Sequence, residues 1–212
     1  MDIDKVLRTL EKEVKNYKVP VAELVEAQTK EPFNVLLATI LAARTNDKTT
    51  TAVVKKLFKE VKHPKDLRRL SEKDVQDLIY PVGFYRNKAR QLKQLGEMLD
   101  SKEIPETMDG LLELPGVGRK TANLVLAVAF RIPAICVDVH VHRIMNRLGY
   151  VRTRTPFDTE MALRKKLPKK HWLKVNYILV AYGQNLCTPV RPWCSKCKVY
   201  DECRRIGVVA NR

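Results

Sequence analysis

Two glycines that flank one valine constrain the fold of this chain most. Gly116 and Gly118 lie in Leu-Pro-Gly-Val-Gly-Arg-Lys, directly before an apolar stretch with helical spacing. The glycines permit a tight turn, and the first amide N–H groups of the following helix lack intrahelical partners. A helix start of this kind binds anions, because its N–H groups and the positive end of the helix dipole face the same point. With Lys120 in the first turn and Asp138 beyond the far end of the helix, the segment predicts chemistry on a polyanion, which we expect to be DNA.

The composition agrees with binding to nucleic acid. The 212 residues include 40 Lys and Arg against 24 Asp and Glu, a formal net charge of +16, which is typical of nucleic-acid-binding proteins. A ribosomal or merely basic protein has the same balance, so charge alone does not decide. No apolar run approaches the ~18 residues of a membrane span, and no signal peptide is recognised. We expect a soluble protein of the prokaryotic cytoplasm, associated with the nucleoid.

Helical spacing of apolar residues predicts an all-α fold. One stripe comprises Ile3, Val6, Leu7, Leu10 and Val14. A second comprises Val53, Val54, Leu57, Phe58 and Val61. We expect about twelve helices and no strand pair. Helix starts are marked by Pro20, Pro32 and Pro64, by Asp47 before a helical run, and by an acidic capping box at residues 71–74.

One segment is ambiguous between a strand and a helix. Val137, Val139 and Val141 alternate with polar residues, as in a half-buried strand. However, Val141 is followed by Ile144 and further apolar residues at helical spacing, and Asp138 is a favourable N-cap. We therefore predict a helix that begins at Asp138.

Two segments are the best candidates for hinges between domains, one near Pro20 and one at residues 131–133. Residues 22–132 would then form one helical domain. Residues 1–21 would pack with residues 133–212 as a second, discontinuous domain. A DNA cleft between the two would place Lys120 and Asp138 on its opposite walls.

Four of the five cysteines are close together in the sequence. They are Cys187, Cys194, Cys197 and Cys203, with the spacing C-x6-C-x2-C-x5-C. Intracellular proteins rarely use disulfides, so this spacing predicts a metal centre. Zinc and an iron–sulfur cluster both accept four thiolates, although a zinc ribbon normally has two C-x2-C pairs and this segment has one. Cys136 stands in an apolar context, and we expect it to be a buried small hydrophobic residue.

Basic side chains accompany the cysteines. They are Arg191, Lys196, Lys198, Arg204 and Arg205. A metal centre would hold these charges on a rigid surface for contact with phosphates. The alternative is an ordinary solvated face.

Three motifs together resemble the endonuclease III family of base-excision DNA glycosylases, in the helix-hairpin-helix superfamily. They are L-P-G-V-G-R-K-T-A-N, V-D-x-H-V-x-R and the cysteine spacing, and the resemblance covers nearly the whole chain. It implies an all-α glycosylase fold, with a six-helix barrel domain and a helical domain that carries a 4Fe-4S cluster. It also implies a monomer that excises oxidised pyrimidines from double-stranded DNA and cleaves the strand at the abasic site.

The resemblance also assigns roles to single residues. Lys120 is implied as the nucleophile and Asp138 as its partner carboxylate, whereas Gly116, Gly118 and Arg119 belong to the DNA-binding hairpin. Cys187, Cys194, Cys197 and Cys203 are implied as the ligands of the 4Fe-4S cluster. We expect a β-branched residue at Gly118 to be severe if the turn needs a positive φ or a close approach of phosphate.

The chain departs from the family pattern at positions that concern the choice of damaged base. Arg44 stands where bacterial relatives usually have a glutamine, and Val139 replaces a usual threonine. Phe84 occupies a place similar to the apolar wedge of the family. A base in the duplex must be rotated out before attack, so Phe84 could act as wedge and Arg44 as plug. The alternatives are core packing for Phe84 and a surface charge for Arg44.

The proposed chemistry makes demands on both catalytic residues. The nucleophile must be a neutral amine, whereas lysine is ordinarily protonated at pH 7. Desolvation and the helix N-terminus both disfavour the ammonium form, and we expect Lys120 to experience both. We expect Asp138 to accept a proton and to stabilise the positive charge that develops as the glycosidic bond breaks. The structural alternatives are a solvated lysine and a carboxylate that only caps a helix.

Three other functions share part of this pattern. A monofunctional glycosylase for mismatched or deaminated bases has the same fold, but such relatives usually lack lysine at position 120. An oxidised-purine lyase retains both catalytic residues but usually lacks the cysteine cluster. A non-catalytic hairpin module that binds DNA needs neither Lys120 nor Asp138.

Overall fold

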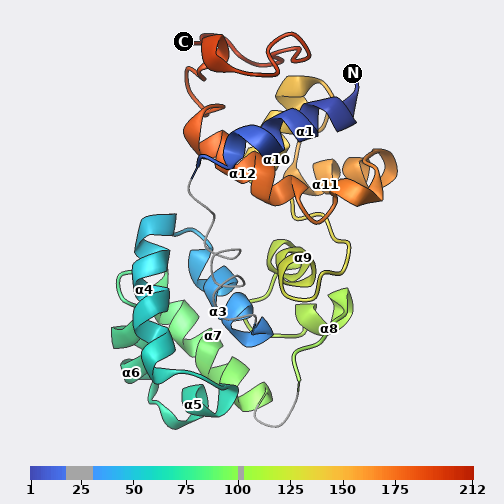
Figure 1. The fold of residues 1–212 in the computed structure, drawn as a ribbon. Helices are drawn as coiled ribbons and strands as arrows, with labels where there is room; N and C mark the ends of the chain where they lie inside the picture. The colour runs from blue at the N-terminus through green and yellow to red at the C-terminus, as the bar shows by residue number, and fades with distance from the viewer. Residues whose placement is uncertain (18–30, 100–102) are drawn as a thin grey trace. The chain divides into compact units, whose positions relative to one another are not determined.

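The computed structural model describes residues 1–17, 31–99 and 103–212, and every regular element within these ranges is a helix (Figure 1). The all-α prediction is therefore confirmed for the described part of the chain. Contacts divide the chain into two compact units, one of residues 1–20 with 133–212 and the other of residues 21–132. The hinge and helix start predicted near Pro20 lie outside the described residues. Within the same ranges, no helix is both long enough and apolar enough to cross a membrane.

The unit of residues 21–132 is built around one apolar helix. Its described helices are α3 (Pro32–Ala42), α4 (Asp47–Glu60), α5 (Pro64–Arg69), α6 (Glu72–Ile79), α7 (Tyr85–Met98), α8 (Met108–Leu112) and α9 (Arg119–Val128). Nearly every side chain of α3 is buried, and α3 packs against α4, α7 and α9. The helix is apolar on all sides because neighbours surround it. Helix α7 packs against α5 and α6, and α8 against α9.

The helix starts of this unit follow the predicted signals closely. Pro32 and Pro64 are the first residues of their helices. Ser71 and Asp74 form the predicted capping box, in which the amide of Asp74 donates to Ser71 Oγ at 3.1 Å. The prediction at Asp47 is wrong by one residue: Asp47 is already helical, and Asn46 Oδ1 caps the helix by accepting from the amide of Thr49.

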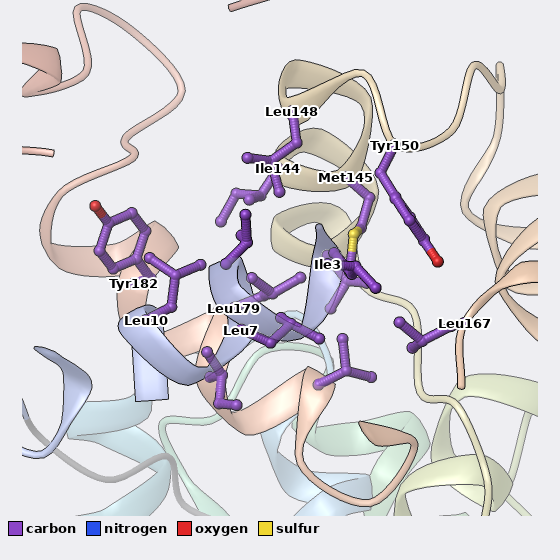
Figure 2. Close-up of a cluster of buried hydrophobic side chains, with 14 of the residues drawn as sticks. Ile3, Leu7, Leu10, Ile144, Met145, Leu148, Tyr150, Leu167, Leu179 and Tyr182 are labelled. Carbon is purple, nitrogen blue, oxygen red and sulfur yellow. The ribbon is translucent and has the colours of Figure 1, made fainter. Parts of the chain in front are cut away.

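The second unit has an aliphatic core among three helices. Its helices are α1 (Ile3–Val14), α10 (Val139–Leu148), α11 (Pro156–Lys166), η1 (Lys169–His171), α12 (Val175–Asn185) and η2 (Cys194–Lys196). Figure 2 shows Leu7 and Leu10 of α1 among side chains of α10 and α12, with Met145 and Leu179 nearby. All five apolar positions of the predicted first stripe are buried. Burial of this face stabilises α1, because an isolated helix of this length has little stability of its own.

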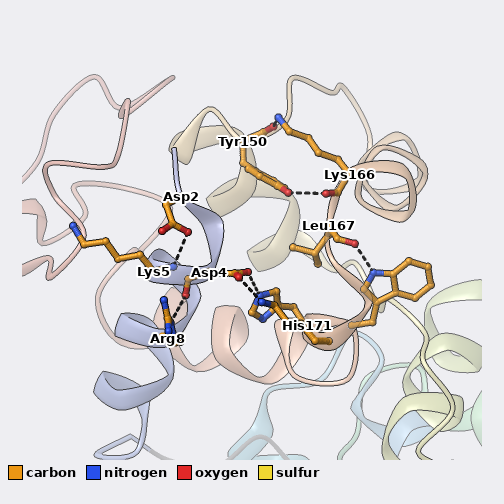
Figure 3. Close-up of polar contacts among 10 residues, drawn as sticks. Asp2, Asp4, Lys5, Arg8, Tyr150, Lys166, Leu167 and His171 are labelled. Carbon is orange, nitrogen blue, oxygen red and sulfur yellow. Dashed lines mark hydrogen bonds and ion pairs between the residues drawn. The ribbon is translucent and has the colours of Figure 1, made fainter.

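Polar contacts attach α1 to the segment that follows α11 (Figure 3). Asp4 accepts from Nε2 of His171 at 2.6 Å and also pairs with Lys170. The hydrogen bond from Lys170 makes the largest contribution to lowering the pKa of Asp4, and the bond from His171 adds to it. The Tyr150 hydroxyl donates to the carbonyl of Lys166 at 2.9 Å. The contacts of Asp4 therefore fix the N-terminal helix to a segment more than 150 residues away in the sequence.

Candidate active site and metal centre

The glycine turn leads into α9 as the sequence predicts, but the two glycines have different roles. Gly116 has a φ of +79°, and a Cβ there would lie 2.9 Å from Oε1 of Gln91. The amide of Val117 donates to the carbonyl of Leu114 at 3.1 Å and closes the turn. Gly116 is therefore favoured by its left-handed backbone conformation, whereas the Gln91 side chain could move to make room for a Cβ.

Gly118 is the N-cap of α9 and has an ordinary backbone conformation. Its φ is −99° and its ψ 175°, and a Cβ at this position would meet no atom within 4 Å. The positive φ that would make a β-branched residue at Gly118 severe is therefore absent, because the turn places that conformation at Gly116. No side chain caps the helix here, so the remaining physical reason for a glycine is the close approach of a ligand.

Lys120 is the second residue of α9 and is exposed. The helix start expected from the sequence is present. The expected desolvation is not seen, because the side chain of Lys120 is exposed. Arg119, directly before it, is half-buried.

Asp138 is the N-cap of α10, as predicted, and is 8% exposed. Its Oδ1 accepts from the amides of His140 and Val141, both at 2.9 Å. Val139, at the position of the usual threonine, is 64% exposed. Asp138 belongs to the unit of residues 1–20 and 133–212, whereas Lys120 belongs to the other, so their pairing stays a prediction.

Arg44 and Phe84 form an exposed pair. The guanidinium carbon of Arg44 lies 5.2 Å from the centroid of the Phe84 ring, a cation–π contact. Both residues have left-handed backbones, with φ of 54° and 60°. Phe84 is 57% exposed, so the alternative that it packs in the core is wrong. Non-glycine residues rarely adopt this conformation, and those that do cluster at functional sites.

The four clustered cysteines all belong to one segment that begins after α12. Cys194 is buried and the other three are half-buried. The Tyr182 hydroxyl donates to Sγ of Cys197 at 3.2 Å, and Nη1 of Arg147 donates to Sγ of Cys187 at 3.3 Å. Burial raises the pKa of the Cys194 and Cys203 thiols, and the neighbouring cysteines add to that increase. Cys187 and Cys197 thus lie near enough to both Cys194 and Cys203 to raise the pKa of those two thiols.

Within residues 1–17, 31–99 and 103–212, no group of three or more His, Cys, Asp or Glu side chains is placed to hold a metal ion. Cys136, by contrast, is 1% exposed, as predicted for a small core residue.

Two arginines of α10 were missed by sequence reasoning. Arg147 is 7% exposed and donates to the carbonyls of Thr188 and Pro189, each at 2.7 Å. Arg143 donates to the carbonyl of Cys187 at 2.9 Å. The signal for Arg147 was its place beside the apolar residues of the stripe, where a lone arginine needs buried acceptors. Both side chains attach the cysteine segment to the helix that Asp138 caps.

The predicted basic contacts are at the surface of the cysteine segment. Arg191 and Lys196 are exposed, and Nζ of Lys196 lies 4.6 Å from the ring centroid of Trp193. Lys198 and Arg204 are also exposed, whereas Arg205 is half-buried over the ring of Tyr200. These positions are compatible with phosphate contact and equally with a solvated face.

A glycine turn, an uncapped helix start and an exposed lysine on an all-helical scaffold define a helix-hairpin-helix protein that is suited to bind nucleic acid. The model of the HhH-GPD superfamily of base excision DNA repair proteins matches residues 37–169. Endonuclease III of Thermotoga maritima is 44% identical over 86% of this chain and 89% of its own length. Endonuclease III of Bacillus subtilis is 38% identical over 82% of this chain and 81% of its own length.

Solved structures agree with these relatives. A trapped covalent endonuclease III–DNA intermediate, an estranged-adenine complex, is 36% identical and has a TM-score of 0.85, over 96% of this chain and 94% of that one. A thermostable thymine-DNA glycosylase, 23% identical with a TM-score of 0.80 over 94% of each chain, shares the fold alone. The chain belongs to the HhH-GPD superfamily of base excision DNA repair proteins and, within it, to the endonuclease III family.

Proposed function

We propose that this protein is a bifunctional DNA glycosylase and AP lyase of base excision repair. It acts as a monomer on double-stranded DNA in the cytoplasm, excises oxidised pyrimidines and cleaves the strand 3′ to the abasic site. The observation that carries the proposal is Lys120, exposed in the first turn of a helix that begins at an uncapped glycine. In the related endonuclease III, a covalent intermediate with DNA has been trapped. A lysine amine is the nucleophile that forms such a bond to a sugar carbon.

The reaction has two bond-breaking steps. The Lys120 amine attacks the anomeric carbon, the glycosidic bond breaks, and the base leaves with the bonding electron pair and takes up a proton. Loss of a proton from the amine and opening of the sugar ring give an imine between Lys120 and the sugar. The imine acidifies the adjacent carbon, removal of its proton forms a carbon–carbon double bond, and the 3′ phosphate leaves. Each step needs a proton acceptor near the sugar.

Asp138 supplies that acceptor in this proposal. Two backbone amides hold its Oδ1, which fixes the orientation of the carboxylate before substrate binds. A fixed negative charge also stabilises the cation that develops at the sugar, and it costs no reorganisation during the reaction. Lys120 is exposed, and in this proposal the bound DNA helps to exclude water from the amine.

Phosphate contacts and stack filling are divided between separate parts of the chain. The turn at Gly116 and Gly118, with Arg119, binds the backbone of the damaged strand. Arg191 and Lys196 add contacts to phosphate. The Arg44–Phe84 pair enters the duplex and fills the space of the everted nucleotide. The phosphate contacts do not depend on the identity of the base, whereas the position of the Arg44–Phe84 pair beside the everted nucleotide does.

A 4Fe-4S cluster held by Cys187, Cys194, Cys197 and Cys203 completes the proposal. These four thiols belong to one segment of the chain, and four cysteine thiolates are the ligand set that a 4Fe-4S cluster takes. When bound, the cluster supplies a cross-link among four points of an otherwise irregular segment. Arg147 donates to Sγ of Cys187 and so helps to fix the orientation of that side chain.

Borohydride reduction in the presence of duplex DNA with one oxidised pyrimidine tests the proposal. With borohydride we expect a covalent protein–DNA adduct, because reduction traps only an imine. Without borohydride we expect cleavage of the strand. Base release without an adduct would instead support a monofunctional glycosylase, and binding without release a hairpin module that is not an enzyme. Iron and sulfide analysis tests the cluster separately, since one zinc and no sulfide would contradict it.

A further inference from the structure

A buried lysine in α7 closes the end of another helix. Lys88 is 5% exposed, and its Nζ donates to the carbonyls of Leu41 and Ala43 at 2.8 and 2.6 Å. The same ammonium is 3.3 Å from Oγ1 of Thr45. The last carbonyls of a helix have no intrahelical partner and carry the negative end of its dipole. Lys88 therefore satisfies the end of α3 and the turn that follows it.

That turn is in direct contact with the loop before α7. The amide of Gly83 donates to Oγ1 of Thr45 at 3.1 Å. A Cβ at Gly83 would lie 2.4 Å from the carbonyl oxygen of Arg44, so the two backbones approach as closely as a glycine allows. Arg44 precedes Thr45 and Phe84 follows Gly83, and these two residues carry the left-handed backbones of the exposed pair. Such conformations persist where surrounding contacts determine them.

We propose that Lys88 is a positioning residue that holds the Arg44–Phe84 pair in place to fill the stack of an everted nucleotide. The inference rests on the proposed function, because the pair has this use only in an enzyme that everts a base. Lys88 itself is buried and touches neither DNA nor the reacting atoms. Its effect passes through Thr45, which accepts hydrogen bonds from both Lys88 and Gly83.

The chemistry of the site supports a positioning role. The three acceptors of Lys88 are uncharged, and burial lowers the pKa of the Lys88 ammonium to about 8. Burial of an ammonium without a carboxylate among these acceptors carries a desolvation penalty that an apolar side chain at this position would not have. A methionine or leucine would pack there more easily, so the charge is retained for the carbonyls it binds.

The same helix offers a matched control. Lys93 donates to the carbonyls of Leu67, Arg68 and Leu70, at 3.3, 2.8 and 2.6 Å, and so closes the end of α5. The two lysines thus make the same kind of contact from one helix. The acceptors of Lys93 are in a different turn from the Arg44–Phe84 pair. Lys93→Met therefore reports the cost of losing a helix end alone.

The experiment compares Lys88→Met and Lys93→Met with the unsubstituted holoprotein. One rate is base release from a duplex with a paired oxidised pyrimidine, in a single turnover. The other is borohydride adduct formation on the same duplex with a preformed abasic site, which has no base to unstack. For Lys88→Met we expect the ratio of the first rate to the second to fall about tenfold, because misplaced groups lose the eversion step first. We expect Lys93→Met to keep the ratio.

A second measurement follows the contact without activity. Hydrogen exchange should become faster at Gly83 and in residues 43–45 of Lys88→Met, and stay unchanged there in Lys93→Met. If Lys88→Met does not fold, Gly83→Ala separates the same two loops while keeping Lys88, and should lower the rate ratio likewise.

Two results would overturn the inference. One is an unchanged rate ratio in Lys88→Met or, where that variant fails to fold, in Gly83→Ala. The other is an equal fall in Lys93→Met, which would make the effect one of general stability. Absence of both base release and adduct in the unsubstituted protein would instead overturn the proposed function and the role of the pair with it. The exchange rates would still show whether Lys88 holds the loops.

Discussion

Two helices of the protein begin in opposite ways. Helix α9 begins after Gly118, which has no side chain to cap it, whereas α10 begins after Asp138, whose Oδ1 accepts from two backbone amides. Both starts concentrate N–H groups and the positive end of a helix dipole. In α10 the chain supplies the negative charge itself. At the start of α9 no side-chain hydrogen bond caps the helix, so in the proposed function a DNA phosphate can bind these amides.

The difference shows how one local structure serves two purposes. A side-chain cap stabilises a helix by about 1 kcal/mol relative to an alanine N-cap, but by only a few tenths of a kcal/mol relative to a glycine N-cap such as Gly118. At α10 the capping interaction also fixes a carboxylate, so stability and orientation come together. At α9 the backbone amides of the first turn stay available to a phosphate of the DNA substrate.

The largest expected effect is that of Lys120→Gln, which removes the amine from the open helix start but leaves the turn intact. We expect adduct formation and base release to be lost, because no other group replaces the nucleophile. DNA binding should survive, since backbone amides and other charges supply most of it. Borohydride trapping and a binding titration measure the two effects. Arg119→Gln, which removes one charge from the same turn, is the control and should retain the adduct; lyase activity at the original rate in Lys120→Gln would reject this nucleophile.

Asp138→Asn tests the closed helix start. An asparagine oxygen can still accept the amide bonds at the cap, but the side chain cannot take up a proton at neutral pH. We expect base release to slow by the ~10²–10⁴ of general acid–base catalysis, with an unchanged thermal midpoint. Asp138→Ala, which loses the cap as well, should also lower the free energy of unfolding by about 1 kcal/mol. If Asp138→Asn loses stability and keeps its rate, Asp138 only caps the helix.

Much of this comparison could be predicted from the sequence, because it depends on residues near one another in the chain. The cap at Asp138, the turn before α9 and the first apolar stripe all follow from local spacing. The exposure of Lys120 did not follow, because burial depends on packing between distant segments. Lys88 was missed for the same reason. Its acceptors lie more than 40 residues earlier, although its place on the apolar face with Leu92 was a usable signal.

Gly118→Ser would convert the open helix start toward the closed kind without changing net charge. A serine N-cap stabilises a helix by a few tenths of a kcal/mol relative to glycine, and the open space at this position accommodates its Cβ. We expect a slightly higher thermal midpoint and about tenfold weaker binding to duplex DNA, because the hydroxyl competes with phosphate for the same amides. Gly118→Ala has the Cβ but no hydroxyl and is the matched control. Equal weakening in the two variants would show that close approach, and not capping, is what the glycine provides.

The smallest expected effect separates the helix start from side-chain cations. Lys196 is exposed in the cysteine segment, and an ammonium that neutralises one phosphate releases counterions, whereas a backbone amide carries no net charge. Lys196→Ala should therefore lower the slope of log affinity against log salt by about 0.9, whereas Gly118→Ser should leave that slope unchanged. Damaged and undamaged duplex should weaken alike in Lys196→Ala, because phosphate contacts carry no base information. Lys73→Ala removes the same charge from a surface ion pair with Asp77 and is the control. If the two lysine variants have the same slope as the unsubstituted protein, Lys196 lies on a solvated face. Phosphate binding then depends on other groups, and the amides at the start of α9 are the first of these to test.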